Sequence, residues 1–240
     1  MAELFRLSVL AALGTILGGW AVVRFLRDRA SIMRLVSGFA AGYLLAVALM
    51  GILPECLSPE NGGHANSVWI LAGFLLVHLM EHGITPHFHY GEETHAGSRM
   101  SGVMALVGLS LHSLMDGVAL AAALMAHGNL GALVFAAILV HRIPEGGTIA
   151  SIFLARGFGS AGAILAASAL ALATLAGAWG QELLRIPVGP TLAAAAGLAI
   201  YVASSDLLPE AQKEKGWKST LALAAGVALF VLTTRFLPHP

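Results

Sequence analysis

The chain has 240 residues, of which 58% are hydrophobic and only 11% are charged, and its formal net charge is zero. Soluble domains carry about 25% charged residues, so this composition excludes an ordinary soluble fold and indicates an integral membrane protein in a lipid bilayer. The neutral balance argues against nucleic acid as a partner, and the single cysteine, Cys56, excludes a disulfide framework within the chain and a thiolate metal cluster.

Eight segments are apolar enough to cross a bilayer, which takes about 20 residues. They lie at residues 3–25, 32–56, 67–86, 101–126, 130–154, 158–182, 188–208 and 217–237. The first segment lacks the basic start of a signal peptide and is interpreted as a retained helix. We therefore predict an all-α integral membrane protein whose residues 1–240 form a single transmembrane domain.

Arginine and lysine residues between the segments predict the orientation, because such residues are enriched in cytoplasmic loops. If the N-terminus lies outside, nine basic residues fall in inside loops and three fall outside. The prediction is a protein of the cell or inner membrane with both termini outside.

The second and seventh segments are similar in sequence. GYLLAVALMGILPEC (42–56) and GLAIYVASSDLLPEA (197–211) are identical at six of fifteen positions, at a constant offset of 155 residues. In the expected orientation they run in opposite directions, which is the inverted-repeat pattern of secondary transporters. A chance match between two helices rich in alanine and leucine is the alternative, although both segments end in Leu-Pro-Glu. We predict a 3+2+3 inverted-repeat arrangement of eight helices.

A connection with many histidines follows the third segment, over residues 82–100. It contains His82, His87, His89 and His95. One interpretation is a cytosolic segment that captures or releases metal, and the other is a polar interfacial loop with exposed histidines.

Two short motifs lie in the central pair of segments, LHSLMDG (111–117) and VHRIPEG (140–146). Residues four apart share one face of a helix, so His112 points with Asp116 and His141 points with Glu145. If the two helices are neighbours, two imidazoles and two carboxylates converge. Zn²⁺ binds such donors at about 2.0–2.2 Å, commonly with four ligands, and the same set suits Fe²⁺, Mn²⁺, Co²⁺ or Cd²⁺.

The energetic cost of these side chains favours a functional site. A charge at the centre of a bilayer costs at least about 2.5–3.5 kcal/mol, and Asp116, Glu145 and Arg142 are all predicted to lie at depth. A divalent cation neutralises the two carboxylates. The alternative is a set of polar contacts between helices in which Arg142 pairs with Asp116 or Glu145.

Two further residues have less specific interpretations. Pro144 has no N–H, so the carbonyl of Val140 loses its usual helix partner and is either an extra oxygen ligand or part of an ordinary kink. Asp206 is the deepest of several carboxylates near segment ends, and it is either a residue of the transport pathway or an exposed interfacial carboxylate.

HSLMDG followed by HRIPEG resembles the two signature helices of the Zrt/Irt-like (ZIP) metal transporters, and the resemblance extends over essentially the whole chain. It implies uptake of a divalent metal into the cytosol, zinc foremost. It further implies a transport site formed by His112, Asp116, His141 and Glu145, and movement of one helix bundle against the other.

The chain departs from the family pattern at the positions directly after the motif histidines. Some family members hold a second metal there with an amide or carboxylate, whereas this chain has Ser113 and Arg142. A guanidinium is always charged and does not ligate metal. Our hypothesis is that Arg142 occupies the place of a second cation and leaves a site for a single metal.

The other classes considered are a membrane metalloenzyme and a metal sensor without transport. The chain lacks the His-Glu-x-x-His pattern of zinc proteases and the additional Glu-x-x-His pairs of di-iron bundles. A sensor stays open, but an inverted repeat favours transport. We predict a transporter and not an enzyme, with apolar faces compatible with a homodimer.

Overall fold

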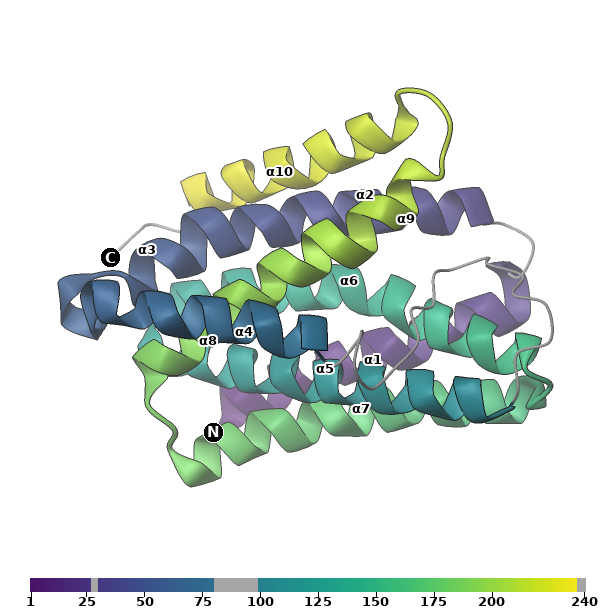
Figure 1. Ribbon diagram of the computed structural model, residues 1–240, viewed down its shortest axis with the longest axis horizontal. Coiled ribbons are helices and arrows are strands. Elements are labelled where there is room, and N and C mark those ends of the chain that lie inside the picture. The colour runs from purple at the N-terminus through teal and green to yellow at the C-terminus, as the bar shows by residue number, and fades with distance from the viewer. Residues whose placement is uncertain (27–29, 80–98, 237–240) are drawn as a thin grey trace.

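The computed structural model describes residues 1–26, 30–79 and 99–236, and all regular structure in these ranges is helical (Figure 1). Seven helical segments in the described ranges are long and apolar enough to cross a membrane. They coincide with seven of the eight predicted segments. The third predicted segment, 67–86, begins as a helix at Ser67 and extends beyond the described residues after Leu79. His82, His87, His89 and His95 lie outside the described residues, so the histidine loop stays a prediction.

From α5 to α10 the helices follow one another with short connections. Their bounds are α1 (Ala2–Ala21), α2 (Ala30–Ala46), α3 (Leu53–Cys56), α4 (Ser67–Leu79), α5 (Arg99–Ala126), α6 (Gly128–Ala155), α7 (Gly159–Leu184), α8 (Val188–Tyr201), α9 (Leu208–Gln212) and α10 (Lys218–Phe236). Only His127 separates α5 from α6.

The two similar segments share a local irregularity. A π-helical turn, Val47–Ile52, joins α2 to α3, and a second one, Val202–Leu207, joins α8 to α9 at the same offset of 155 residues. The α2–α3 and α8–α9 segments run in opposite directions (Figure 1). The resemblance found in the sequence therefore extends to backbone geometry.

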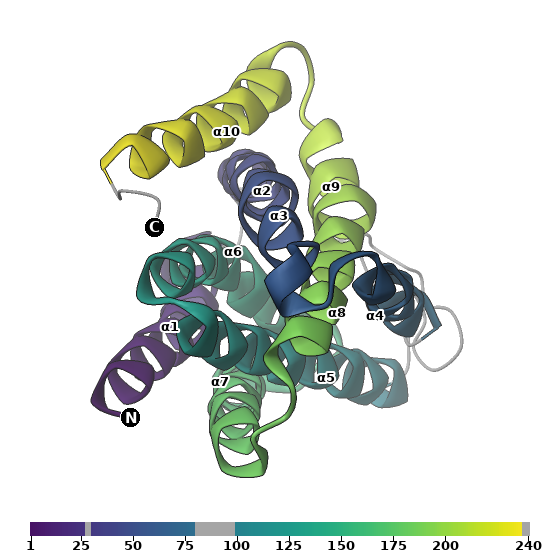
Figure 2. The same cartoon turned by 90° about the vertical axis from the view of Figure 1, so that its left-hand side faces the viewer.

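The helices form two bodies (Figure 2). In the first, which we call the motif body, α1 and α5 each pack along α6 and α7. In the second, the flanking body, α2 packs along α10 and α4 packs along α8, with α3 and α9 as extensions of α2 and α8. The two bodies meet mainly where α2 packs on α6 and α5 packs on α8. The two motif helices are therefore central, and each faces one helix of the flanking body.

Glycines allow close backbone contacts within the motif body. A Cβ atom on Gly146 of α6 would collide with the carbonyl of Thr15 on α1, and one on Gly117 of α5 would collide with the carbonyl of Thr174 on α7. Membrane helices associate through such small residues, because apolar surface alone gives no preference over lipid. The glycine after each motif carboxylate thus anchors its helix against a neighbour.

A hydrophobic core joins the two bodies at the end of the molecule that carries α3 (Figure 1). Most of its members come from α2, α5, α6 and α8, and they include Tyr43, Leu120, Leu130 and Leu192. A second core at the opposite end comes almost entirely from the motif body. The bodies are therefore most closely packed at the α3 end.

Candidate metal centre

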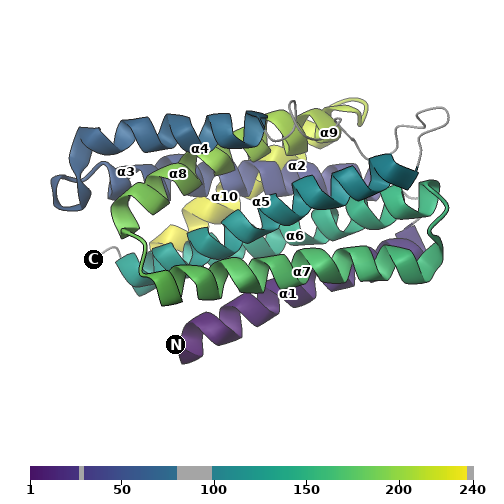
Figure 3. The same ribbon diagram turned by 60° about the horizontal axis from the view of Figure 1, so that its bottom comes forward.

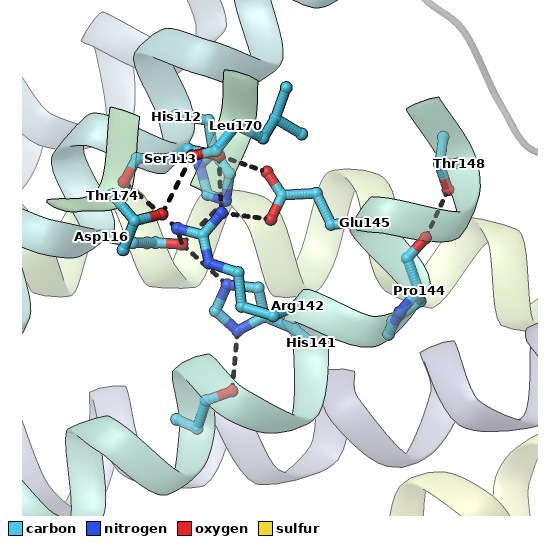
Figure 4. A network of polar contacts seen from close by, with 11 residues as sticks. His112, Ser113, Asp116, His141, Arg142, Pro144, Glu145, Thr148, Leu170 and Thr174 are labelled. Carbon is cyan, nitrogen blue, oxygen red and sulfur yellow. Dashed lines mark hydrogen bonds and ion pairs between the residues drawn. The ribbon is translucent and has the colours of Figure 1, made fainter. Parts of the chain in front are cut away.

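The four predicted donors converge in the middle of the motif body (Figure 4). His112 and Asp116 project from α5, and His141 and Glu145 project from α6. All four are buried, and one ligand atom from each lies within 4.8 Å of the others. Ligand atoms around a tetrahedral zinc ion with bonds of about 2.0 Å are about 3.3 Å apart. A small contraction of this cluster is thus enough to enclose one ion.

The backbone orients the ring of His141. Its Nδ1 lies 2.8 Å from the carbonyl oxygen of Ala137, one turn earlier on α6, and must donate because a carbonyl only accepts. This leaves Nε2 facing the cluster, 2.8 Å from Asp116 Oδ2. A backbone carbonyl on the remote nitrogen is a common device for orienting a metal-binding imidazole.

The second imidazole, that of His112, contacts the cluster through one ring nitrogen. His112 Nε2 lies 3.3 Å from Asp116 Oδ2. Its buried Nδ1 has no hydrogen-bond partner among the described residues. The ring of His112 therefore presents Nε2 to Asp116, which makes this nitrogen the candidate ligand atom.

Arg142 bridges the two carboxylates. Its side chain is completely buried, with one terminal nitrogen 2.5 Å from Glu145 Oε2 and the other 2.9 Å from Asp116 Oδ2. The sequence left open whether Arg142 pairs with one of the acids or the acids bind metal. The structure brings both features together, because the guanidinium pairs with both acids while the four donors stay clustered.

Ser113 completes the network. Its Oγ accepts a 2.6 Å hydrogen bond from Arg142 and donates a 2.9 Å hydrogen bond to Glu145 Oε1, and its carbonyl accepts from the same guanidinium at 3.2 Å. The hydroxyl group therefore joins the cation to one of the anions. Sequence reasoning noted the position but missed this bridge, and it missed the orienting role of Ala137.

Pro144 and Asp206, the two less specific candidates, do not belong to the cluster of four donors. Helix α6 continues through Pro144, whose carbonyl accepts a 2.9 Å hydrogen bond from Thr148 Oγ1. Asp206 lies in the π-helical turn before α9, in the flanking body, and is partly buried. The proposed roles of the Val140 carbonyl and of Asp206 stay predictions.

A second polar contact, which the sequence did not suggest, links the two bodies at the α3 end. His127, between the motif helices, has its Nε2 3.3 Å from Glu55 Oε2. Asn61 donates a 2.8 Å hydrogen bond to the other oxygen of Glu55. This contact lies beside the hydrophobic core that joins the bodies.

The helices and the buried donors define a membrane protein of several spans, with a cluster that fits a borderline divalent metal. Residues 87–234, more than half of the chain, match the family described as "ZIP Zinc transporter". The chain belongs to this family, and the resemblance found in its two motifs is confirmed.

Two curated relatives are likewise named zinc transporters. The chain is 28% identical over 200 residues to "Zinc transporter ZIP13" of Pongo abelii, covering 75% of this chain and 60% of that protein. It is 26% identical over 218 residues to "Zinc transporter YKE4" of Saccharomyces cerevisiae, covering 76% of this chain and 62% of that protein. The chain thus spans less than two thirds of the length of either relative. Both names describe transporters, as the family name does, and not enzymes.

Proposed function

We propose that the chain moves one divalent transition-metal ion at a time into the cytosol, with His112, Asp116, His141 and Glu145 as its transport site. The observation that carries this proposal is the convergence of four buried donors from two neighbouring helices within 4.8 Å. Zinc is the first candidate, since two imidazoles and two carboxylates suit it and both relatives are named for it. Fe²⁺, Mn²⁺ and Cd²⁺ are further candidates with the same donors.

The proposed site holds a single ion. The positions that hold a second metal in the resemblance are Ser113 and Arg142, and a guanidinium has no donor atom for a metal. Arg142 contacts Asp116 Oδ2 and Glu145 Oε2, which are oxygens of two of the four proposed metal ligands. Cargo binding therefore displaces the guanidinium from both carboxylates.

Transport proceeds in this proposal by alternating access, with the motif body moving against the flanking body. A 3+2+3 inverted repeat supports it, in which α1, α2 and α4 correspond to α7, α8 and α10 around the α5–α6 pair. The matching π-helical turns and the opposite directions of α2 and α8 favour this correspondence. So do Gly42 and Gly197, which are 155 residues apart and each lie against a carbonyl of a neighbouring helix.

The proposed orientation has both termini outside. The start of α1 and the end of α10 lie at the same end of the molecule (Figure 3), as an even number of spans requires. The bias of basic residues toward the opposite end supports an outside position for the termini. The histidine segment 82–100 is then cytosolic, and we keep metal release as its proposed role.

Uptake of radioactive zinc, iron, manganese and cadmium into proteoliposomes tests the site. We expect His141→Ala and Glu145→Ala each to lower uptake more than about tenfold, because each removes one of four ligands. The control is His64→Ala, since His64 is exposed on the loop before α4. Unchanged uptake in both site variants would defeat the assignment.

Metal stoichiometry tests the claim of a single ion. Crystals soaked with zinc should give one anomalous peak among the four donors. Two peaks about 4 Å apart, the spacing of two-metal sites, would contradict it.

A further inference from the structure

The charge of Arg142 lies entirely inside the proposed transport site. Its side chain is 0% exposed, and its two terminal nitrogens contact one carboxylate each. Asp116, Glu145 and Arg142 together contribute two negative charges and one positive charge. The arginine therefore lowers the net charge of the metal-free site from −2 to −1.

The guanidinium contacts oxygens of both carboxylates that the proposed cargo would also need. Asp116 Oδ2 is 2.9 Å from Arg142, and it also lies beside both imidazoles. A soluble counter-ion has to be captured from the cytosol after each release. Arg142 is covalently attached next to both acids, so it reoccupies them as soon as the metal leaves.

A carrier must return after releasing its cargo, and the charge of the metal-free site decides what that step costs. Moving an unpaired carboxylate through a low-dielectric barrier is unfavourable. A loaded site without the arginine is neutral, whereas its metal-free form carries −2. With the arginine, the loaded and metal-free forms carry +1 and −1. The arginine thus lowers the cost of returning the metal-free form, while it adds one positive charge to the loaded form.

We propose that Arg142 is the built-in counter-cation of the return step, so that the metal-free transporter re-orients without carrying an ion back from the cytosol. This inference rests on the proposed function. It specifies that metal transport is not coupled to the movement of another cation in the opposite direction. It makes the protein a carrier that needs no exchanged cation.

The test compares two modes of transport in proteoliposomes. Net uptake of radioactive zinc into zinc-free vesicles requires the metal-free return. Exchange against an excess of internal non-radioactive zinc does not, because the site returns loaded. In Arg142→Gln we expect net uptake to fall at least about tenfold relative to exchange. Arg142→Lys keeps the charge and should keep the ratio of the native protein.

A second measurement uses the native protein, in case Arg142→Gln does not fold. Its net uptake should keep the same rate when internal sodium or potassium is replaced by N-methylglucamine. A requirement for an internal alkali ion would overturn the proposal. So would an equal loss of both modes in a folded Arg142→Gln protein, or net uptake that is undiminished relative to exchange. No transport by the native protein in either mode would instead refute the proposed function.

Discussion

Ser113 is the residue on which the geometry of the cluster depends most directly. Its Oγ is within 2.9 Å of both the cation and one of the anions, inside a site closed to solvent. Because the hydroxyl accepts from Arg142 and donates to Glu145, it holds the carboxylate in one rotamer. A small neutral side chain therefore positions two large charged ones.

Ser113→Ala should weaken both the fold and the site. Removing the hydroxyl leaves two charged groups with one hydrogen bond fewer, and such bonds contribute about 1.5–3 kcal/mol each. We expect a lower thermal midpoint in detergent and a higher KM for zinc uptake. The control is Ser168→Ala on α7, whose Oγ donates to the carbonyl of Ile164 in its own helix. Equal behaviour of the two variants would mean that the bridge has no special role.

For single residues, the sequence predicts which side chains share a helix face but not which partner each side chain contacts. The spacing of four residues is enough to place His112 beside Asp116 and His141 beside Glu145. The long side chain of Arg142 has too many rotamers for its sequence position to determine which acid it meets. The carbonyl of Ala137 is a backbone atom that any residue supplies, so no letter of the sequence marks its role.

At the scale of the helices, α6 packs closely against α1. Gly146 directly follows the proposed ligand Glu145, and a Cβ on Gly146 would collide with the carbonyl of Thr15 on α1. Gly146→Ala should therefore push α6 away from α1, at about 1–3 kcal/mol of stability, and displace Glu145. Thermal unfolding and zinc uptake should both decline. Gly180→Ala on α7 is the matched control, since its Cβ meets nothing within 4 Å, and it should be neutral or slightly stabilising. A normal Gly146→Ala protein would show that the contact can relax freely.

The helices themselves could be predicted, whereas their irregular turns could not. Pro54 and Pro209 each follow a π-helical turn, because a proline leaves an earlier carbonyl without its N–H partner. Pro144 has the same chemistry, yet α6 continues through it as an α-helix. The contacts with neighbouring helices decide whether a proline causes a π-helical turn or leaves the α-helix continuous. The sequence therefore shows where the helix is perturbed, but not which backbone geometry results.

For the molecule as a whole, the two bodies should move relative to each other. In a Cys56→Ala background, a short reversible thiol cross-linker between Gly51→Cys and Leu130→Cys connects the flanking body to the motif body. These positions are close, since a Cβ on Gly51 would lie 3.7 Å from Leu130 Cδ1. Cross-linking should stop zinc uptake, and reduction should restore it.

The control pair for this experiment lies inside the flanking body. A Cβ on Gly38 would lie 3.4 Å from Cβ of Ala222, so Gly38→Cys with Ala222→Cys connects α2 to α10 within one body. This cross-link should leave uptake intact. Full uptake by the cross-linked Gly51–Leu130 protein would contradict a relative movement of the two bodies.

The sequence alone could not predict how the helices divide into the motif body and the flanking body. In a soluble helix the apolar face marks what is buried, but membrane helices are apolar on the lipid side as well. Helix α10 shows the difficulty, because it packs along α2 while Leu221 and Leu232 are exposed. Hydropathy therefore predicts the number of helices and gives no information on their partners.

The burial of Arg142 also has a consequence for biosynthesis. Helix α6 carries Arg142 and Glu145, and α5 carries Asp116, the second carboxylate that the guanidinium contacts. Since only His127 separates these helices, they leave the ribosome almost as one hairpin. A chain that ends after α5 has Asp116 without its arginine, whereas the full hairpin contains the guanidinium that contacts both carboxylates. We therefore expect α5 and α6 to insert into the membrane together.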